Sequence, residues 1–223
     1  MITSRDNEKL KLVRKLHERR WRDKLGLFFV EGEDLVEAAT VDPVELLRAG
    51  EDVDPRLLAE VSTAAHPPRV IAVYRRDSLP QWETRPVTLA LWRVADPGNV
   101  GTLVRTADAF GARVALSDGC ADPTSPKALR ASAGSIWRVP IGVSDKLSQG
   151  SKRVGLTAHG GTPLGEVDLH GDDVTILLGA EREGLPDEIE RDIDAWIPIG
   201  GAESLNVAAA GAIALYEWRR QNS

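Results

Sequence analysis

Apolar positions in the first part of the chain alternate between helical and strand spacing. Leu10, Val13 and Leu16 recur three residues apart within residues 5–24, which is the spacing of one helix face. Shorter apolar runs after them predict three strands and two further helices, the strands at 27–32, 44–50 and 69–76 and the helices at 33–40 and 54–62. The pattern predicts a small α/β domain over residues 1–76.

Residues 77–86 interrupt the pattern. They contain Pro80 and Pro86 among charged residues and show no periodicity, which is typical of a linker between domains. A second domain over residues 87–223 is therefore expected.

The strand pattern restarts strongly after the linker. Residues 87–94 are almost continuously apolar, as expected for a strand buried on both faces. A helix over 100–111, closed by Gly111, and a strand over 112–118 complete a βαβ unit. Further strands are expected at 137–143, 153–158, 174–180 and 195–199, and further helices at 125–135, 186–193 and 204–220. This order predicts a parallel sheet with helices on both faces, whose ligands bind beyond the carboxyl ends of the strands.

Charge is distributed unevenly along the chain. The 223 residues carry a net charge of −6, but residues 1–24 contain nine basic and four acidic residues and are +5, which leaves −11 on the remainder. A basic arm on an acidic body suits contact with a phosphate backbone, because local charge decides such contacts. The alternative is a solvated helix face without a partner.

Composition disfavours several classes of protein. The single cysteine, Cys120, excludes an internal disulfide and suits a reducing compartment. The N-terminus has no apolar signal-peptide core, and no apolar run approaches the roughly 20 residues that span a bilayer. The four histidines have no ligand-like spacing, so we expect no metal site. A cytoplasmic protein without a membrane or metal partner is expected.

The loop after the first strand of the second domain carries candidate chemistry. Gly98 and Gly101 permit a close backbone approach, Asn99 lies at the mouth of a helix, and Arg105 interrupts an otherwise small and apolar helix. The loop is neither a dinucleotide-binding fingerprint nor a phosphate-binding P-loop. Asn99 can alternatively be a helix cap, and Arg105 can simply pair with Asp108.

Two later loops also follow predicted strands. Glu181 comes two residues after Gly179, in a turn that can alternatively be a plain strand-to-helix connection. Ser204 and Asn206 stand at the start of the last helix, after a Gly-Gly turn. Only one of them is needed as the cap, so the other has a free hydrogen-bonding group.

The three loops have the order and residues of the three motifs of a known family. These are Asn99 to Arg105 followed by AFGA, then GAEREGLP, then IPIGGAESLNVAAAGAIALYE. On these motifs, residues 87–220 resemble the SpoU/TrmH group of the SPOUT superfamily. Residues 1–76 look similar to the ribosomal-protein-like domain that binds substrate in many members.

The resemblance implies an enzyme that methylates the 2′-hydroxyl of ribose in RNA with S-adenosylmethionine. It also implies a homodimer and a C-terminal trefoil knot, which periodicity could not reveal. The implied cofactor-binding residues are Leu178, Gly179, Ile197, Ile199 and Leu205. The implied catalytic residues are Arg105, Asn99, Glu181, Ser204 and Asn206. The implied RNA-binding residues are Arg5, Lys9, Arg14, Arg19, Lys127 and Arg130.

The implied roles can be compared with residue chemistry. Arg105 would lie nearest the 2′-hydroxyl, with Asn99 orienting it, Glu181 bracing the site, and Ser204 and Asn206 holding the methionine end and the ribose. A guanidinium with a pKa above about 12 is a poor base, so phosphate binding and stabilisation of the alkoxide form an equally economical role for Arg105.

One position departs from the family pattern. Many members have serine where this chain has Ala208, so the role of that position is open here.

Three hypotheses follow. The first is an RNA 2′-O-methyltransferase acting on ribosomal RNA, with transfer RNA as the close variant. The second is an RNA-binding or assembly factor that kept the fold without catalysis; the intact motif residues speak against it. The third, a nucleotide-dependent Rossmann enzyme, ranks last because no GxGxxG follows a strand.

Overall fold

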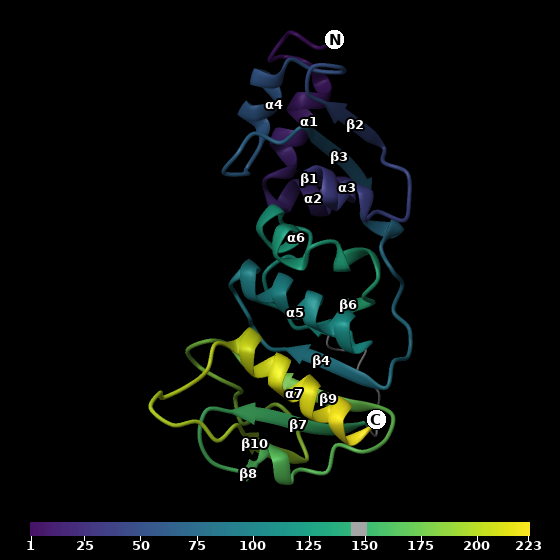
Figure 1. Ribbon diagram of the computed structural model, residues 1–223. Helices are drawn as coiled ribbons and strands as arrows, with labels where there is room; N and C mark the ends of the chain where they lie inside the picture. Colours follow the sequence, from purple (N-terminus) through teal and green to yellow (C-terminus); the bar gives the residue numbers. More distant parts are fainter. Residues whose placement is uncertain (144–150) are drawn as a thin grey trace.

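A computed structural model describes residues 1–143 and 151–223, which form two successive β-sheets (Figure 1). The first sheet is antiparallel, in the order β1-β3-β2. Its strands are β1 (Leu27–Glu31), β2 (Glu45–Arg48) and β3 (Val70–Arg75). It is accompanied by the helices α1 (Glu8–Leu16), α2 (Arg19–Leu25), α3 (Glu33–Glu37) and α4 (Pro55–Val61).

The second sheet is parallel throughout, in the order β6-β5-β4-β9-β7-β10-β8. Its strands are β4 (Val87–Leu91), β5 (Arg113–Leu116), β6 (Ile141–Val143), β7 (Lys152–Thr157), β8 (Thr162–Pro163), β9 (Val174–Leu178) and β10 (Ile193–Trp196). The helices that follow its strands are α5 (Pro97–Phe110), α6 (Pro126–Ser132) and α7 (Val207–Gln221). Short 3₁₀ turns lie at Arg76–Ser78, Ser135–Trp137 and Leu164–Glu166. The predicted α/β class with a parallel second sheet is confirmed.

The first helix is shorter than predicted. Residues 5–24 form two helices, because Glu18 takes an extended conformation between α1 and α2. The guanidinium of Arg22 explains the break: its Nη1 donates to the carbonyls of Leu16 and His17, each at 2.8 Å. Arg22 therefore binds the free carbonyls at the end of α1.

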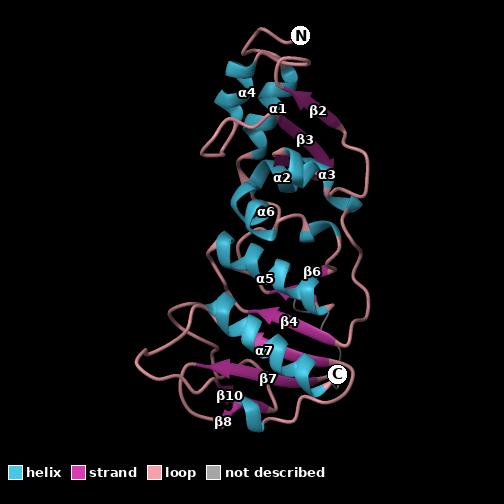
Figure 2. Ribbon diagram, viewed as in Figure 1, coloured by secondary structure: helices cyan, strands magenta, loops and turns pink. Residues whose placement is uncertain are grey.

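Helices cover one face of the parallel sheet, as Figure 2 shows for α5 and α7. Side chains alternate along β4, with Leu89 and Leu91 in the large core beneath these helices and Ala90 in a small cluster on the opposite face. Trp82, Leu185 and Ile189, which lie outside helices, pack on that second face. The expectation of helices on both faces is corrected for the described residues.

No helix forms over residues 186–193, contrary to the sequence-based expectation. Arg191 occupies the carbonyls that such a helix would need, since its Nη1 donates to the carbonyls of Pro186 (2.9 Å) and Ile189 (3.1 Å). The next strand also ends earlier than expected, at Trp196. Pro198 has no N–H to continue the ladder, so the segment after Trp196 becomes loop.

The two sheets are joined through a shared core and buried ion pairs. Phe28 and Tyr74 from the first sheet pack with Trp137 from the second part of the chain. Next to this core, Arg22 Nε donates to Asp122 Oδ2 at 2.8 Å, with both side chains at most 5% exposed. Burial alone would raise the pKa of Asp122, but Arg76, Thr124 and Arg22 outweigh it and hold that pKa below its usual value.

We expect Asp122→Asn to lower the free energy of unfolding by about 3–5 kcal/mol, because it leaves the buried Arg22 uncompensated. Because the pKa of Asp122 is lower in the folded than in the unfolded protein, ionised Asp122 stabilises the fold. This stabilisation is fully present above the unfolded pKa of about 3.9, and it is lost as the pH falls through the lower pKa of the folded protein. Urea titration at pH 7 measures the loss. Asp23→Asn is the control, because Asp23 pairs with Arg76 at the exposed surface and its loss should cost under about 1 kcal/mol. Equal losses in both variants would contradict this account.

Candidate active site

The loops that follow β4, β9 and β10 meet at the carboxyl edge of the parallel sheet, as parallel strands require. Two adjoining cavities open there, of about 410 and 1040 Å³. They share the segment 180–182 and Asn206 as a common wall. Three loops distant in sequence therefore build one site.

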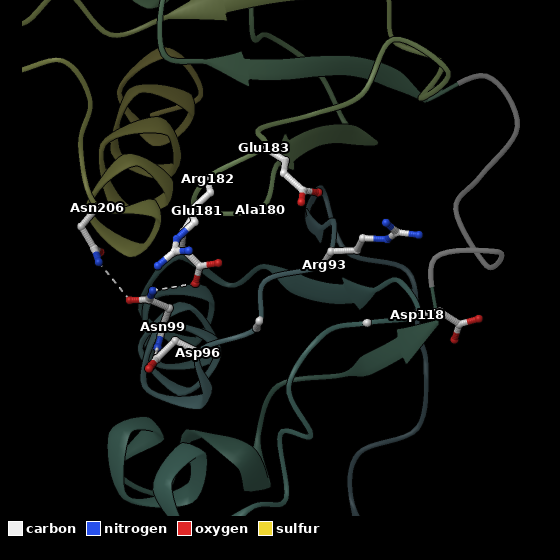
Figure 3. Close-up of a pocket in the computed structure, with 11 residues that line it drawn as sticks. Arg93, Asp96, Asn99, Asp118, Ala180, Glu181, Arg182, Glu183 and Asn206 are labelled. Carbon is white, nitrogen blue, oxygen red and sulfur yellow. Dashed lines mark hydrogen bonds between the residues drawn. The ribbon is translucent and has the colours of Figure 1, made fainter.

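A chain of hydrogen bonds crosses this common wall (Figure 3). The Asn206 amide donates to Asn99 Oδ1 at 3.0 Å, and the Asn99 amide donates to Glu181 Oε1 at 2.9 Å. Asn206 Oδ1 also accepts from the N–H groups of residues 208 and 209, and so caps α7. Asn206 is thus both the cap and a member of the site, whereas Ser204 lines the smaller cavity with an exposed side chain.

Asn99 is not the cap of α5, which corrects one alternative drawn from the sequence. Asp96 is the cap, accepting from the N–H groups of Gly98 (2.6 Å) and Asn99 (3.1 Å). Lys127 Nζ lies 2.7 Å from Asp96 Oδ2 and is the main cause of the lowered pKa of Asp96. The Asn99 side chain is therefore free to enter the hydrogen-bond chain.

The Glu181 carboxyl is held in its ionised form. Burial would raise its pKa, but the side chain of Asn99 and nearby backbone groups, including those of Asp96 and Ala95, together lower it. The site thus presents a fixed carboxylate beside two oriented amides.

The smaller cavity has an apolar lining with a few polar groups, as small-molecule sites commonly have. Gly179 lies at its wall, where an added Cβ would come within 2.1 Å of the Gly184 carbonyl carbon. All five residues implied for cofactor binding line this cavity, namely Leu178, Gly179, Ile197, Ile199 and Leu205. Ile197 and Ile199 reach it because β10 ends early.

Arg105 lies outside both cavities. It is six residues beyond Asn99 on α5, about 9 Å along the helix axis, and its side chain is exposed. Asp108 is not its partner, because Asp108 pairs with Arg138 at 2.6 Å and accepts from Ser135. Within residues 1–143 and 151–223, Arg105 has no ion pair or hydrogen-bonded side-chain partner.

The cations implied for RNA binding all have partners within the chain. Arg5 pairs with Glu60, and Arg14 donates to the Arg5 carbonyl. Lys9 pairs with Glu45, Arg19 with Asp23, Lys127 with Asp96, and Arg130 with Glu31. Five of these six cations are therefore partly offset by a carboxylate, and the sixth, Arg14, is held by a backbone carbonyl.

Two groups of residues were missed in the sequence. Arg93 and Arg182 line the larger cavity, and neither forms an ion pair in the part of the chain that the structure describes. On α2, Trp21 has Lys15 and Lys24 over its ring at 5.4 and 5.1 Å. Trp21 lies in the basic N-terminal segment, whose charge also fits ordinary surface residues, whereas Arg93 and Arg182 stand among apolar and acidic residues that give no such signal.

Among the described residues, no helix has the length and apolar character needed to cross a membrane. The same residues contain no cluster of His, Cys, Asp or Glu side chains suited to hold a metal ion.

Comparison with known proteins supports the family that the three sequence motifs resemble. Residues 86–216 match the model of the SpoU rRNA methylase family, and residues 7–73 match the MRM3-like substrate binding domain. The chain is 33% identical to the 23S rRNA (guanosine(2553)-2′-O)-methyltransferase of Bacillus subtilis, over 98% of both chains.

Solved structures extend the similarity to the whole fold. An AdoMet-bound rRNA methyltransferase from Sinorhizobium meliloti is 30% identical, with a TM-score of 0.88 over 98% of this chain and 97% of that one. AviRb from Streptomyces viridochromogenes, a SpoU methyltransferase solved with AdoMet, is 27% identical, with a TM-score of 0.83 over 97% and 98%. The family model spans more than half of the chain, and the likeness in fold covers nearly all of it. This protein belongs to the SpoU rRNA methylase family and is a SpoU/TrmH-type methyltransferase.

Proposed function

We propose that this protein transfers a methyl group from S-adenosylmethionine to a ribose 2′-hydroxyl of structured RNA, and that this RNA is ribosomal RNA. One observation supports this above all: the hydrogen-bonded chain Asn206–Asn99–Glu181 lies at the junction of a cofactor-sized cavity and a larger open one. Such a wall can hold a donor on one side and an acceptor nucleotide on the other.

The smaller cavity suits S-adenosylmethionine by the chemistry of its lining. Leu178, Ile197 and Leu205 offer apolar contact for an adenine ring, and Ser204 supplies a hydroxyl for the polar end of the molecule. The bound cofactor would supply an electrophilic methyl group on a sulfonium centre. The chain's own task is then to orient the acceptor, exclude competing water and stabilise the charge that develops on the acceptor oxygen.

The residues of the wall divide these tasks. Asn206 is fixed by its capping bonds to α7, so its amide has one orientation and fixes that of Asn99. The Glu181 carboxylate completes the chain and braces the loop that separates the cavities. We assign Arg105 to the phosphate next to the target ribose, where its charge would stabilise the 2′-alkoxide.

Ribosomal RNA is the favoured substrate class because relatives named for it match along the whole chain. A neighbour whose structure concerns 2′-OH methylation of tRNA matches over only 60% of this chain. A non-catalytic binding role is the second candidate; the intact hydrogen-bonded wall speaks against it.

The homodimer and the trefoil knot remain proposals. The exposed face of α7 carries Ile213 and Tyr216, which are 39% and 61% exposed, beside the small Ala209. A second copy packed on this face would bury both side chains.

RNA contact by the N-terminal domain is proposed around Trp21 rather than through the paired cations. We expect Lys15→Gln with Lys24→Gln to reduce the slope of log K against log salt for RNA binding by about 1–2. Lys9→Gln with Arg5→Gln is the matched control, since both of these cations already pair with carboxylates. A larger change in the control would overturn this placement. Truncation is unsuitable as a test, because α1 supplies core residues.

Titration calorimetry with S-adenosylmethionine tests the cofactor assignment. Saturable binding, lost on Leu205→Arg and absent with NAD, is expected. Binding of NAD instead would favour a Rossmann-type enzyme, and no binding of S-adenosylmethionine would contradict the proposal.

A further inference from the structure

Arg93, at the carboxyl end of β4, has a backbone conformation that arginine rarely adopts. Its φ is +50°, in the left-handed region that favours glycine. Its N–H donates to Ser117 Oγ at 3.0 Å, and its side-chain stem lies against Gly119, where an added Cβ would come within 3.1 Å of Arg93 Cγ. A strained backbone angle persists only where the surrounding contacts enforce it, and such angles are concentrated at functional sites.

The strained backbone places a charged side chain at the larger cavity. Arg93 lines that cavity and is exposed. It has no carboxylate partner among the residues that the structure describes. Its guanidinium carbon lies over the Trp92 ring, 5.5 Å from the ring centre. Figure 3 shows it extending away from the Asn99–Glu181–Asn206 wall, at the end that Asp118 also lines. A guanidinium is thus available some way along the cavity from the proposed methylation point.

The charges around this cavity explain what such a guanidinium can do. Four carboxylates line it, those of Asp96, Asp118, Glu181 and Glu183, against the guanidiniums of Arg93 and Arg182. Asp96 is already paired with Lys127. A phosphodiester in this cavity would be repelled by the carboxylates and attracted only by the two arginines. A guanidinium suits this role because it can form two parallel hydrogen bonds to the oxygens of one phosphate.

We propose that Arg93 binds a backbone phosphate of the RNA that flanks the target nucleotide, and so sets how the strand runs through the larger cavity. This rests on the proposed function of the site. Arg93 is here a substrate-binding residue, presented to the cavity by a strained backbone. Two opposite effects follow for Arg93→Gly: relief of the backbone strain and loss of the phosphate contact.

The test compares Arg93→Gly and Arg93→Lys with the unsubstituted protein. The probe is an unmodified in vitro transcript of 23S rRNA, with S-adenosylhomocysteine present, between about 50 and 200 mM salt. For Arg93→Gly we expect a Kd raised about tenfold or more, a salt slope reduced by about 1, and a melting temperature that falls by less than about 2 °C. Arg93→Lys should keep the salt slope. Arg56→Gln, which removes an exposed arginine on α4 at the far end of the molecule, is the control for loss of charge alone (Figure 1).

Each outcome is decisive for Arg93. An unchanged Kd and slope in Arg93→Gly, or an equal change in Arg56→Gln, would overturn the inference. A raised Kd with an unchanged slope would mean contact with a base rather than a phosphate. A large fall in melting temperature with weaker S-adenosylhomocysteine binding would mean a structural role. Because binding is the readout, a protein that binds RNA through Arg93 without transferring methyl would refute the proposed function and keep this inference.

Discussion

Replacing Arg105 with alanine is expected to lower kcat for methyl transfer to RNA by at least about 10²-fold, while leaving the fold and S-adenosylmethionine affinity unchanged. The size follows from the loss of the charge that we assign to the phosphate beside the developing alkoxide. The fold should be unaffected because Arg105 is exposed and has no side-chain partner in the described part of the chain. Single-turnover transfer of labelled methyl, with circular dichroism and calorimetry on the same sample, measures all three quantities.

Thr102→Ala is the matched control for Arg105→Ala. Thr102 lies one turn earlier on α5 and is also exposed. Its loss should change kcat less than about twofold. Full activity in Arg105→Ala would remove Arg105 from the mechanism and leave the wall of Asn99, Glu181 and Asn206 as the whole chemical site.

Gly179→Ala is expected to raise the Kd for S-adenosylmethionine by at least about 100-fold. The added Cβ would lie 2.4 Å from the Gly184 carbonyl oxygen and as close to the Leu185 nitrogen, both of which are backbone atoms. Paired bonds between Ala180 and Gly184 hold this turn closed, at 3.1 and 2.9 Å. The turn must therefore open, and the cavity wall that it forms is lost.

Gly165→Ala distinguishes this effect from the general cost of changing glycine. An added Cβ at Gly165 meets nothing within 4 Å, and the φ of Gly165 is not positive. This variant should bind S-adenosylmethionine as the unsubstituted protein does. Normal affinity in Gly179→Ala would mean that the cofactor lies elsewhere.

Much of the site could be predicted from sequence because its residues follow buried strands. Parallel strands bring their carboxyl ends to one edge, so Asn99, Glu181 and Asn206 were expected at the same edge, and the family resemblance named them as site residues. Their roles in the reaction stay a proposal. The spare hydrogen-bonding capacity at the start of the last helix was also visible, although the structure shows Asn206 filling both roles.

The secondary-structure errors arise from side chains that bind backbone carbonyls only a few residues away. Arg191 binds the carbonyls that a helix over 186–193 would need, and Arg22 does the same at the end of α1. Periodicity contains no information on such contacts. The same holds for Lys9, whose charge looked available for RNA but is neutralised by Glu45.

Arg93 shows a further limit. Its importance lies in a backbone angle and in the cavity that it lines, neither of which has a residue-level signature. The dimer and the knot depend on the same kind of long-range arrangement.

The central claim is tested most directly by transfer of labelled methyl from S-adenosylmethionine to ribosomal RNA that lacks the modification, followed by alkaline hydrolysis. A 2′-O-methyl group blocks cleavage at its own nucleotide, so we predict label in alkali-resistant dinucleotides, appearing at least about 10²-fold more slowly with Arg105→Ala. Label found only in mononucleotides would place the methyl group on a base and contradict the account.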